Sequence, residues 1–174
     1  MTSARVLEKT ARILGWPAEY IGRCLGVLVV LGVVGMFAVV LTRYAFGFSE
    51  AWLRELVLAL NAAVFLLGAS FAMARDEHVR VDVLSKRFSP RTKKWVELGG
   101  VLLIVLPFAV FVLVVSWRYV ATSFAIGERS NEPGGLAHLW VIKGLIPAFA
   151  VLLILQALAN ACKMLARTGH EERG

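Results

Sequence analysis

Four windows of 18 to 20 residues carry no charged side chain, while charged residues are dense in the segments between them. At about 1.5 Å of rise per residue, a helix of roughly 20 residues covers about 30 Å, the thickness of the hydrocarbon core of a bilayer. Open strands would leave backbone groups unpaired in lipid, so segments of this kind must be helical. The chain is therefore predicted to be an all-α integral membrane protein with four transmembrane helices, at about 24–42, 56–74, 98–117 and 139–161.

Composition favours a single membrane domain over residues 1–174. Hydrophobic residues make up 59% of the chain, against about 45–50% in soluble domains. Burial inside a large soluble protein is the alternative for each window, but 174 residues leave too little chain to bury four such helices. The first window is longer than the apolar part of a signal peptide, roughly 7–15 residues, so an uncleaved first helix is expected.

The distribution of Lys and Arg predicts the orientation, because cytoplasmic segments of membrane proteins are enriched in these residues. The side with both termini and the second connection has 14 of them, and the other side has 5. Both termini are therefore predicted to be cytoplasmic. The second connection is also expected to hold a short interfacial helix at 81–89. Its candidate contacts with lipid headgroups are Arg80, Lys86, Arg87, Lys93 and Lys94. The net charge of +7 favours lipid, rather than nucleic acid, as a partner.

Enzyme and cofactor-binding classes find little support in the residues. The three histidines, His78, His138 and His170, fall in connections or the tail, which argues against a haem-bearing membrane anchor of a redox enzyme. No cluster has the spacing of a metal site or of a nucleophile with its base, so no catalytic residue, metal ligand or cofactor is predicted in this chain. A stand-alone small exporter would need an ionisable group at membrane depth, and the four windows lack one. These two classes are the alternatives to the interpretation below.

Polar and proline residues inside the windows have two readings each. Asn61 and Gly68 lie seven residues apart, on one face of the second helix, and are the candidate interhelical contacts. The Asn61 amide is expected to contact another helix, with a polar pathway as the alternative. Pro107 and Pro147 each remove an amide donor from the helix backbone. They predict static bends in the third and fourth helices, with hinges as the alternative.

Three blocks of residues carry a resemblance to a known family. The first block is Arg43-Tyr44-x-Phe46 followed by Trp52-x-x-Glu55. The second is Gly68-Ala69 followed by Arg75-x-Glu77-His78-Val79-Arg80-Val81-Asp82. The third is Ser130-x-Glu132-Pro133-Gly134-Gly135-Leu136 followed by Trp140-x-x-Lys143 and Pro147. In this order, within four spans, they resemble the small membrane subunit, or Q subunit, of tripartite ATP-independent periplasmic (TRAP) transporters.

The resemblance implies a scaffold role in the inner membrane of a bacterium. Q subunits associate with a large membrane subunit that carries the substrate and sodium sites. A periplasmic binding protein delivers the substrate, typically an organic anion such as a carboxylate. The chain is therefore expected to support sodium-coupled uptake, with sodium bound by the large subunit and no enzyme activity of its own.

The outer ends of the helices hold the candidate contact residues. The connection over 126–136 contains a Pro-Gly-Gly turn and is the expected docking surface for the binding protein, with a plain surface loop as the alternative. Its candidate residues are Glu128, Arg129, Glu132, Pro133, Gly134 and Gly135. Candidate contacts with the outer membrane surface or a partner are Arg43, Tyr44, Trp52, Arg54, Glu55, Trp140 and Lys143.

Overall fold

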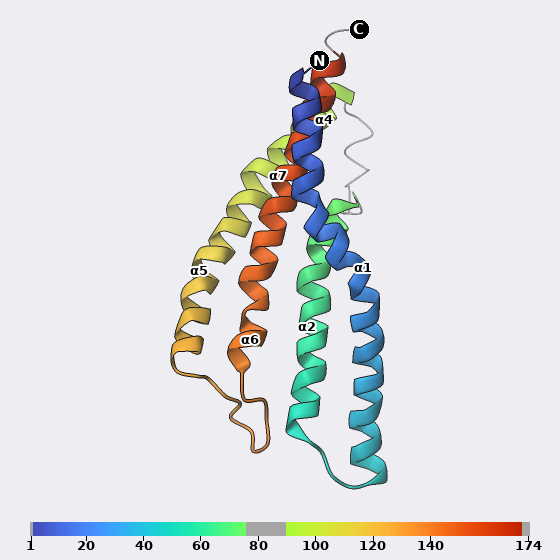
Figure 1. Ribbon diagram of the computed structural model, residues 1–174, viewed down its shortest axis with the longest axis vertical. Coiled ribbons are helices and arrows are strands. Elements are labelled where there is room, and N and C mark those ends of the chain that lie inside the picture. Colours follow the sequence, from blue (N-terminus) through green and yellow to red (C-terminus); the bar gives the residue numbers. More distant parts are fainter. Residues whose placement is uncertain (1, 76–89, 172–174) are drawn as a thin grey trace.

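The computed structural model describes residues 2–75 and 90–171, which form helices and short connections without a strand (Figure 1). Its elements are α1 (Thr2–Ala45), α2 (Ala51–Ala74), α4 (Pro90–Gly100), the π-helix η1 (Val101–Val105), α5 (Leu106–Ala125), α6 (Leu139–Lys143) and α7 (Leu145–Glu171). Four stretches are long and apolar enough to cross a membrane: Val6–Ala45, Ala51–Ala74, Trp95–Ala125 and Leu139–Ala166. The predicted all-α fold with four spans is confirmed. The expected helix at 81–89 lies outside the described residues.

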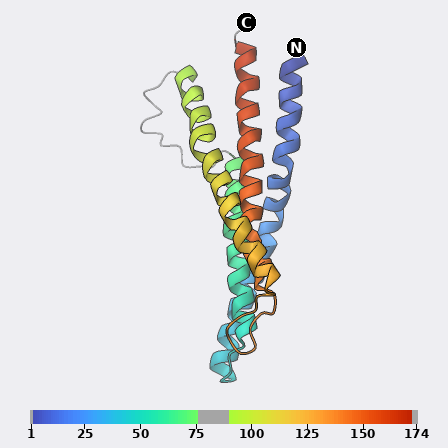
Figure 2. The ribbon, with the colours of Figure 1, turned by 90° about the vertical axis from the view of Figure 1, so that its left-hand side faces the viewer.

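The two termini lie at one end of the molecule, and the α1–α2 and α5–α6 connections lie at the other (Figure 1). Helices α1, α2 and α7 contact one another, and α5 packs against α7 without comparable contact to α1 or α2. Seen from the side, the helices separate toward the termini (Figure 2). Helix α7 is therefore the central element, with neighbours on several sides.

Small residues allow the close approach of α1 to its neighbours. Ala11 and Ala18 on α1 are buried, as are Ala159 and Ala166 on α7. Where α1 passes α2, a Cβ atom added to Gly22 would overlap the ring of Phe71. Close van der Waals packing of this kind holds membrane helices together, because lipid supplies no hydrophobic driving force between them.

Helix α1 is much longer than a membrane span. Its 44 residues correspond to about 66 Å at roughly 1.5 Å per residue, about twice the hydrocarbon thickness. The predicted span at 24–42 is only its second half. The first half runs beside the end of α7 near the termini (Figure 1), and α7 also continues beyond the predicted end at residue 161, to Glu171.

Both predicted proline bends coincide with irregular helix. The π-helix η1 lies directly before Pro107, and the Leu106 N–H donates to the carbonyl of Val101, five residues back. Pro107 cannot donate to the carbonyl of Leu103, so the wider turn changes the hydrogen-bond register where that donor is missing. Pro147 lies three residues after Gly144, where the helix is interrupted between α6 and α7.

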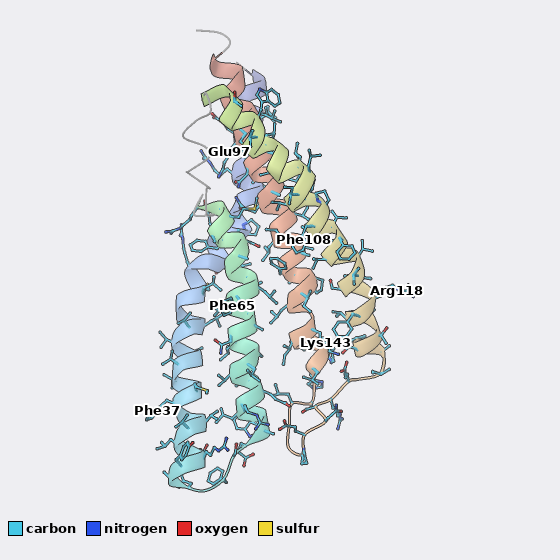
Figure 3. The ribbon with its side chains drawn as sticks, turned by 180° about the vertical axis from the view of Figure 1, so that it is seen from behind. Phe37, Phe65, Glu97, Phe108, Arg118 and Lys143 are labelled. Carbon is cyan, nitrogen blue, oxygen red and sulfur yellow. The ribbon has the colours of Figure 1, made fainter. Side chains whose placement is uncertain are left out.

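The apolar faces are largely uncovered in the isolated chain. Only 11% of the apolar window of α1 and 33% of that of α7 lie buried. Phe37, Phe65 and Phe108 project from three different spans (Figure 3) and are more than half exposed. Such surface is stable only against lipid or the apolar helices of another membrane protein.

Candidate functional site

The α5–α6 connection, residues 126–138, lies at the end of the molecule away from the termini (Figure 1). We call it the outer loop, after the side of the membrane on which the sequence predicts it. Its chain folds back on itself, with the Ser130 N–H donating to Leu136 O at 2.9 Å and the Leu139 N–H donating to Glu128 O at 3.2 Å. Gly134 lies at the tip with a φ of 76°, a conformation that favours glycine. The sequence Pro-Gly-Gly thus makes the sharp turn that was predicted.

Glu55, near the start of α2, fastens the outer loop to the helix bundle. One carboxylate oxygen accepts a hydrogen bond from the hydroxyl of Ser130, and the other accepts one from the N–H of Leu136 at 2.7 Å. Gly135 packs into this contact, since an added Cβ would overlap the Ser130 side chain and lie 3.0 Å from Glu55 Oε1. A residue larger than glycine does not fit here without moving the loop.

Two ion pairs hold the outer loop, one near its start and one near its tip. Lys143 of α6 donates to Glu128 at 2.7 Å and lies over the ring of Tyr119, with 4.1 Å from Nζ to the ring centroid. The hydrogen bonds from Lys143 hold the pKa of the Glu128 carboxyl below its usual value. Arg54 of α2 pairs with Glu132, but both side chains are about half exposed, so solvent screens this pair more strongly.

The candidate docking residues therefore divide into two groups. Glu128 and Glu132 are paired with cations of this chain, and Gly135 packs against Glu55. Arg129, Pro133 and Gly134 are exposed. Docking through this surface remains a prediction. Of the charged residues in it, only Arg129 has no ion pair within the described part of the chain.

The candidate residues at the outer membrane surface also occupy different environments. Arg54, Glu55 and Lys143 hold the outer loop through side-chain bonds. Trp140 packs edge-on against Phe124, with ring centroids 5.1 Å apart. The remaining three, Arg43, Tyr44 and Trp52, are exposed.

The two candidate interhelical contacts on α2 differ as well. A Cβ on Gly68 would lie 3.4 Å from Leu25, so Gly68 belongs to the interface of α1 and α2. Asn61 is exposed and forms no hydrogen bond within the described residues. An interhelical contact of the Asn61 amide therefore requires a helix from another chain.

A buried polar pair inside the bundle was not predicted. Gln156 of α7 donates to the side-chain oxygen of Asn160 at 2.9 Å, and Asn160 donates to the Met73 carbonyl at 3.2 Å. Gln156 is fully buried. Two amides four residues apart on one face of an apolar helix were the available sequence signal, and they join α7 to the end of α2.

The candidate headgroup residues fall mostly outside the described part of the chain. Arg80, Lys86 and Arg87 belong to 76–89, and Lys93 and Lys94 fall in α4. Across residues 2–75 and 90–171, no group of three or more His, Cys, Asp or Glu side chains could hold a metal ion. The polar contacts of the described residues join the outer loop and the helices to one another.

Comparison with known proteins gives one family match. The family described as "Tripartite ATP-independent periplasmic transporters, DctQ component" matches residues 32–167. This range covers the last third of α1 and most of α7, and it includes at least part of each of the four spans. No solved structure matches the chain.

Two curated relatives are similar to parts of the chain. The C4-dicarboxylate TRAP transporter small permease protein DctQ of Vibrio cholerae is 36% identical over 83 residues, which are 48% of this chain and 35% of that protein. The sialic acid TRAP transporter permease protein SiaT of Haemophilus influenzae is 27% identical over 119 residues, which are 68% of this chain and 18% of that protein. The aligned segments thus span about a third or less of each relative's own length.

Proposed function

Because the chain belongs to the DctQ family of TRAP transporter components, we propose that it is the scaffold subunit that supports a large membrane subunit during uptake of an organic anion. In this proposal a periplasmic binding protein delivers the substrate, and the large subunit binds it together with sodium. The names of the two relatives, which refer to a C4-dicarboxylate and to sialic acid, support a carboxylate as substrate.

The absence of charge from all four apolar windows is the observation that carries the scaffold role. A carrier that couples ion movement to an anionic substrate needs charged or coordinating groups at membrane depth. The buried amides Gln156 and Asn160 bond to each other and to a backbone carbonyl, so they tie helices together. Substrate and sodium are therefore expected to bind on another chain.

The exposed amide of Asn61 supports a membrane-embedded partner. It projects from the middle of a 24-residue apolar helix, where lipid tails offer no hydrogen bond. Most of the sialic acid permease lies outside the segment that aligns with this chain. That relative therefore combines a similar segment with a much larger body in one protein, as the proposed pair of subunits would do in two.

The basic residues support cytoplasmic termini and a location in the inner membrane. Both termini lie at the same end (Figure 1), on the side with 14 of the 19 Lys and Arg residues. A cysteine at Ser130 should react with an impermeant thiol reagent from the periplasm. A cysteine at Ser89 should react only after the membrane is opened, and the reverse pattern would contradict this orientation.

The exposed part of the outer loop is proposed to help dock the binding protein. Arg129 is a suitable test position, because it is exposed and has no ion pair within the described residues. Arg129→Glu should slow association and change its salt dependence, while the Glu55 contacts of the loop stay intact. An unchanged uptake curve against binding-protein concentration, at low and high salt, would place docking on the large subunit.

Reconstitution tests the whole proposal. Vesicles that contain this chain alone should show no substrate uptake under an inward sodium gradient, and adding the large subunit and the binding protein should produce it. Uptake by this chain alone would identify a stand-alone carrier. A visible absorption band in the purified chain would identify the membrane anchor of a redox enzyme.

A further inference from the structure

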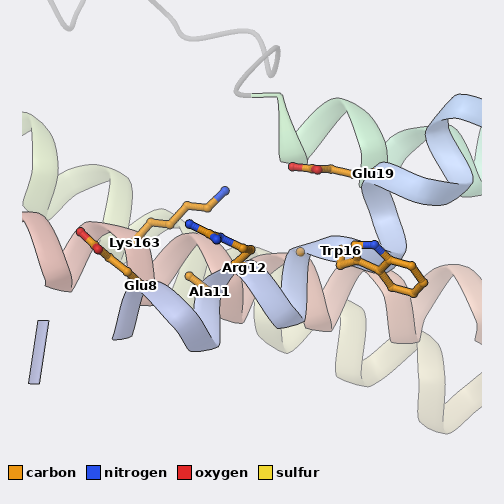
Figure 4. Close-up of a pocket in the computed structure, with 7 residues that line it drawn as sticks. Glu8, Ala11, Arg12, Trp16, Glu19 and Lys163 are labelled. Atoms are coloured by element: carbon orange, nitrogen blue, oxygen red, sulfur yellow. The ribbon is translucent and has the colours of Figure 1, made fainter. Parts of the chain in front are cut away.

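A groove between the first half of α1 and the end of α7 lies near the termini and has a volume of about 450 Å³ (Figure 4). We call it the terminal groove. Its lining includes Glu8, Arg12, Gly15, Trp16, Glu19 and Lys163. It is separate from the outer loop, which lies at the opposite end of the molecule (Figure 1).

Two cations from different helices point into the same part of this groove. Figure 4 draws the guanidinium of Arg12 and the ammonium of Lys163 on one side, with the carboxylate of Glu8 pointing away from them. Neither cation forms an ion pair with another described residue. Two like charges at one site repel each other, so an anionic group between them would be stabilised by both.

Exposed aromatic side chains place the groove at the level of lipid headgroups. Trp16 lines the groove and stacks on Tyr20, with ring centroids 5.4 Å apart. Both rings are more than half exposed, and so is Trp95 on α4. Exposed Trp and Tyr at the end of a span are typical of the membrane–water interface. Lys163 is the first charged residue after the apolar stretch of α7, as expected at that boundary.

The charge of the groove selects among lipid headgroups. Two acidic and two basic side chains line it, so its formal charge is balanced. A purely anionic headgroup would satisfy the cations but would leave Glu19, on the other side of them from Glu8, facing a like charge (Figure 4). A headgroup that joins a phosphate to a primary ammonium can bond to the two cations and to Glu19, because the ammonium donates N–H groups that carboxylates accept.

We propose that the terminal groove binds a phosphoethanolamine lipid headgroup, with the phosphate between Arg12 and Lys163 and the ammonium toward the carboxylate of Glu19. Glu8 lies 11 residues from Glu19 on the same helix, about 16 Å away, so one headgroup does not reach both carboxylates. The acyl chains would lie along the apolar surface of the spans below. Such a lipid would join α1 to α7 at the headgroup level. This inference does not depend on the proposed transport role.

Lipid binding to the delipidated full-length chain in detergent tests the proposal. Short-chain phosphatidylethanolamine, phosphatidylglycerol and phosphatidylcholine, and inorganic phosphate, are added separately and bound ligand is counted by native mass spectrometry. Phosphatidylethanolamine should bind most tightly. Arg12→Gln or Lys163→Gln should weaken its binding by about tenfold, the size expected for one charge-assisted hydrogen bond. Arg118→Gln, an exposed cation on α5 at the outer end, serves as the matched control and should leave binding unchanged.

The carboxylates provide a second test that keeps both phosphate ligands in place. Glu19→Gln should remove the preference for phosphatidylethanolamine over phosphatidylglycerol, whereas Glu8→Gln should leave it unchanged, because the Glu8 carboxylate points away from the cations (Figure 4). Equal binding of all three lipids to the unaltered chain would overturn the proposal. So would unchanged selectivity in Glu19→Gln, or inorganic phosphate that competes as well as the lipid and so reveals a site for free anions.

Discussion

Gly22 is the position where a single methyl group should do the most damage to the contact of α1 with α2. A Cβ at this position would overlap three carbons of the Phe71 ring, Cγ, Cδ2 and Cε2. Moving the Phe71 ring would also disturb its contact with the Arg75 guanidinium, whose Cζ lies 4.7 Å from the ring centroid. Overpacking of this kind typically costs about 1–3 kcal/mol.

Gly26 provides the matched control, one helical turn away on the same helix. A Cβ there meets no atom within 4 Å, so Gly26→Ala should keep only the gain in helix propensity, up to about 1 kcal/mol. Both substitutions share that gain. The free energies of unfolding of Gly22→Ala and Gly26→Ala should therefore differ by about 1–3 kcal/mol, which is roughly a 5- to 150-fold difference in the unfolding equilibrium constant.

The assay is unfolding of the purified chain in mixed micelles with increasing denaturing detergent, followed by circular dichroism. In a chain that already carries Phe71→Ala, Gly22→Ala should cost little stability, because the ring that the new methyl group overlaps is absent. Equal unfolding midpoints for Gly22→Ala and Gly26→Ala would refute the close approach of α1 and α2 at this point.

Further predictions concern the subunit contact and the outer loop. Asn61→Leu should weaken copurification with the large subunit by roughly fivefold, which corresponds to about 1 kcal/mol for one interhelical hydrogen bond. The stability of the isolated chain should not change. Unchanged copurification would show that the amide faces lipid. Gly135→Ala should push the turn at Gly135 away from Ser130 and Glu55, so a protease should cut the loop faster than in the unaltered chain. Equal cutting rates would contradict the close packing. Because the pKa of Glu128 is lowered by Lys143, its stabilising effect is present above the ordinary pKa of 4.5 and is lost as the pH falls through the lowered value. Hydrogen exchange in the loop should rise over that acidic range in the unaltered chain. Glu128→Gln should reduce this dependence and leave the part due to Glu55, whose pKa is also lowered, by hydrogen bonds from Leu136 and Ser130.

The apolar spans could be predicted from the sequence because lipid imposes a simple requirement of length and charge. The first half of α1 could not be found in this way, since Glu8 and Arg12 resemble a solvated tail. The small residues Ala11, Gly15 and Ala18 at helical spacing were a signal that a search for charge-free windows passes over. The fold places them against α7, so packing rather than hydropathy defines this part of the helix.

The candidate site was predictable in its location but not in its pairing. The sequence indicated an outer loop with charges and a tight turn, yet the partner of Glu132 is Arg54, 78 residues away in the chain. A contact of that sequence separation depends on which helices are neighbours, and spacing within a segment carries no information about it. The same holds for Asn160, whose acceptor is the Met73 carbonyl, 87 residues away.

The joint packing of α1 and α7 has a consequence for the response to bilayer thickness. A single span usually adapts to a thinner membrane by tilting independently of its neighbours. Here the first half of α1 is fixed along α7 through Ala11, Ala18, Ala159 and Ala166, so its second half cannot tilt without bending the helix or moving α7. Hydrophobic mismatch should therefore rotate the subunit as one rigid body. A change in lipid acyl-chain length would therefore change the angle at which this chain meets an attached subunit.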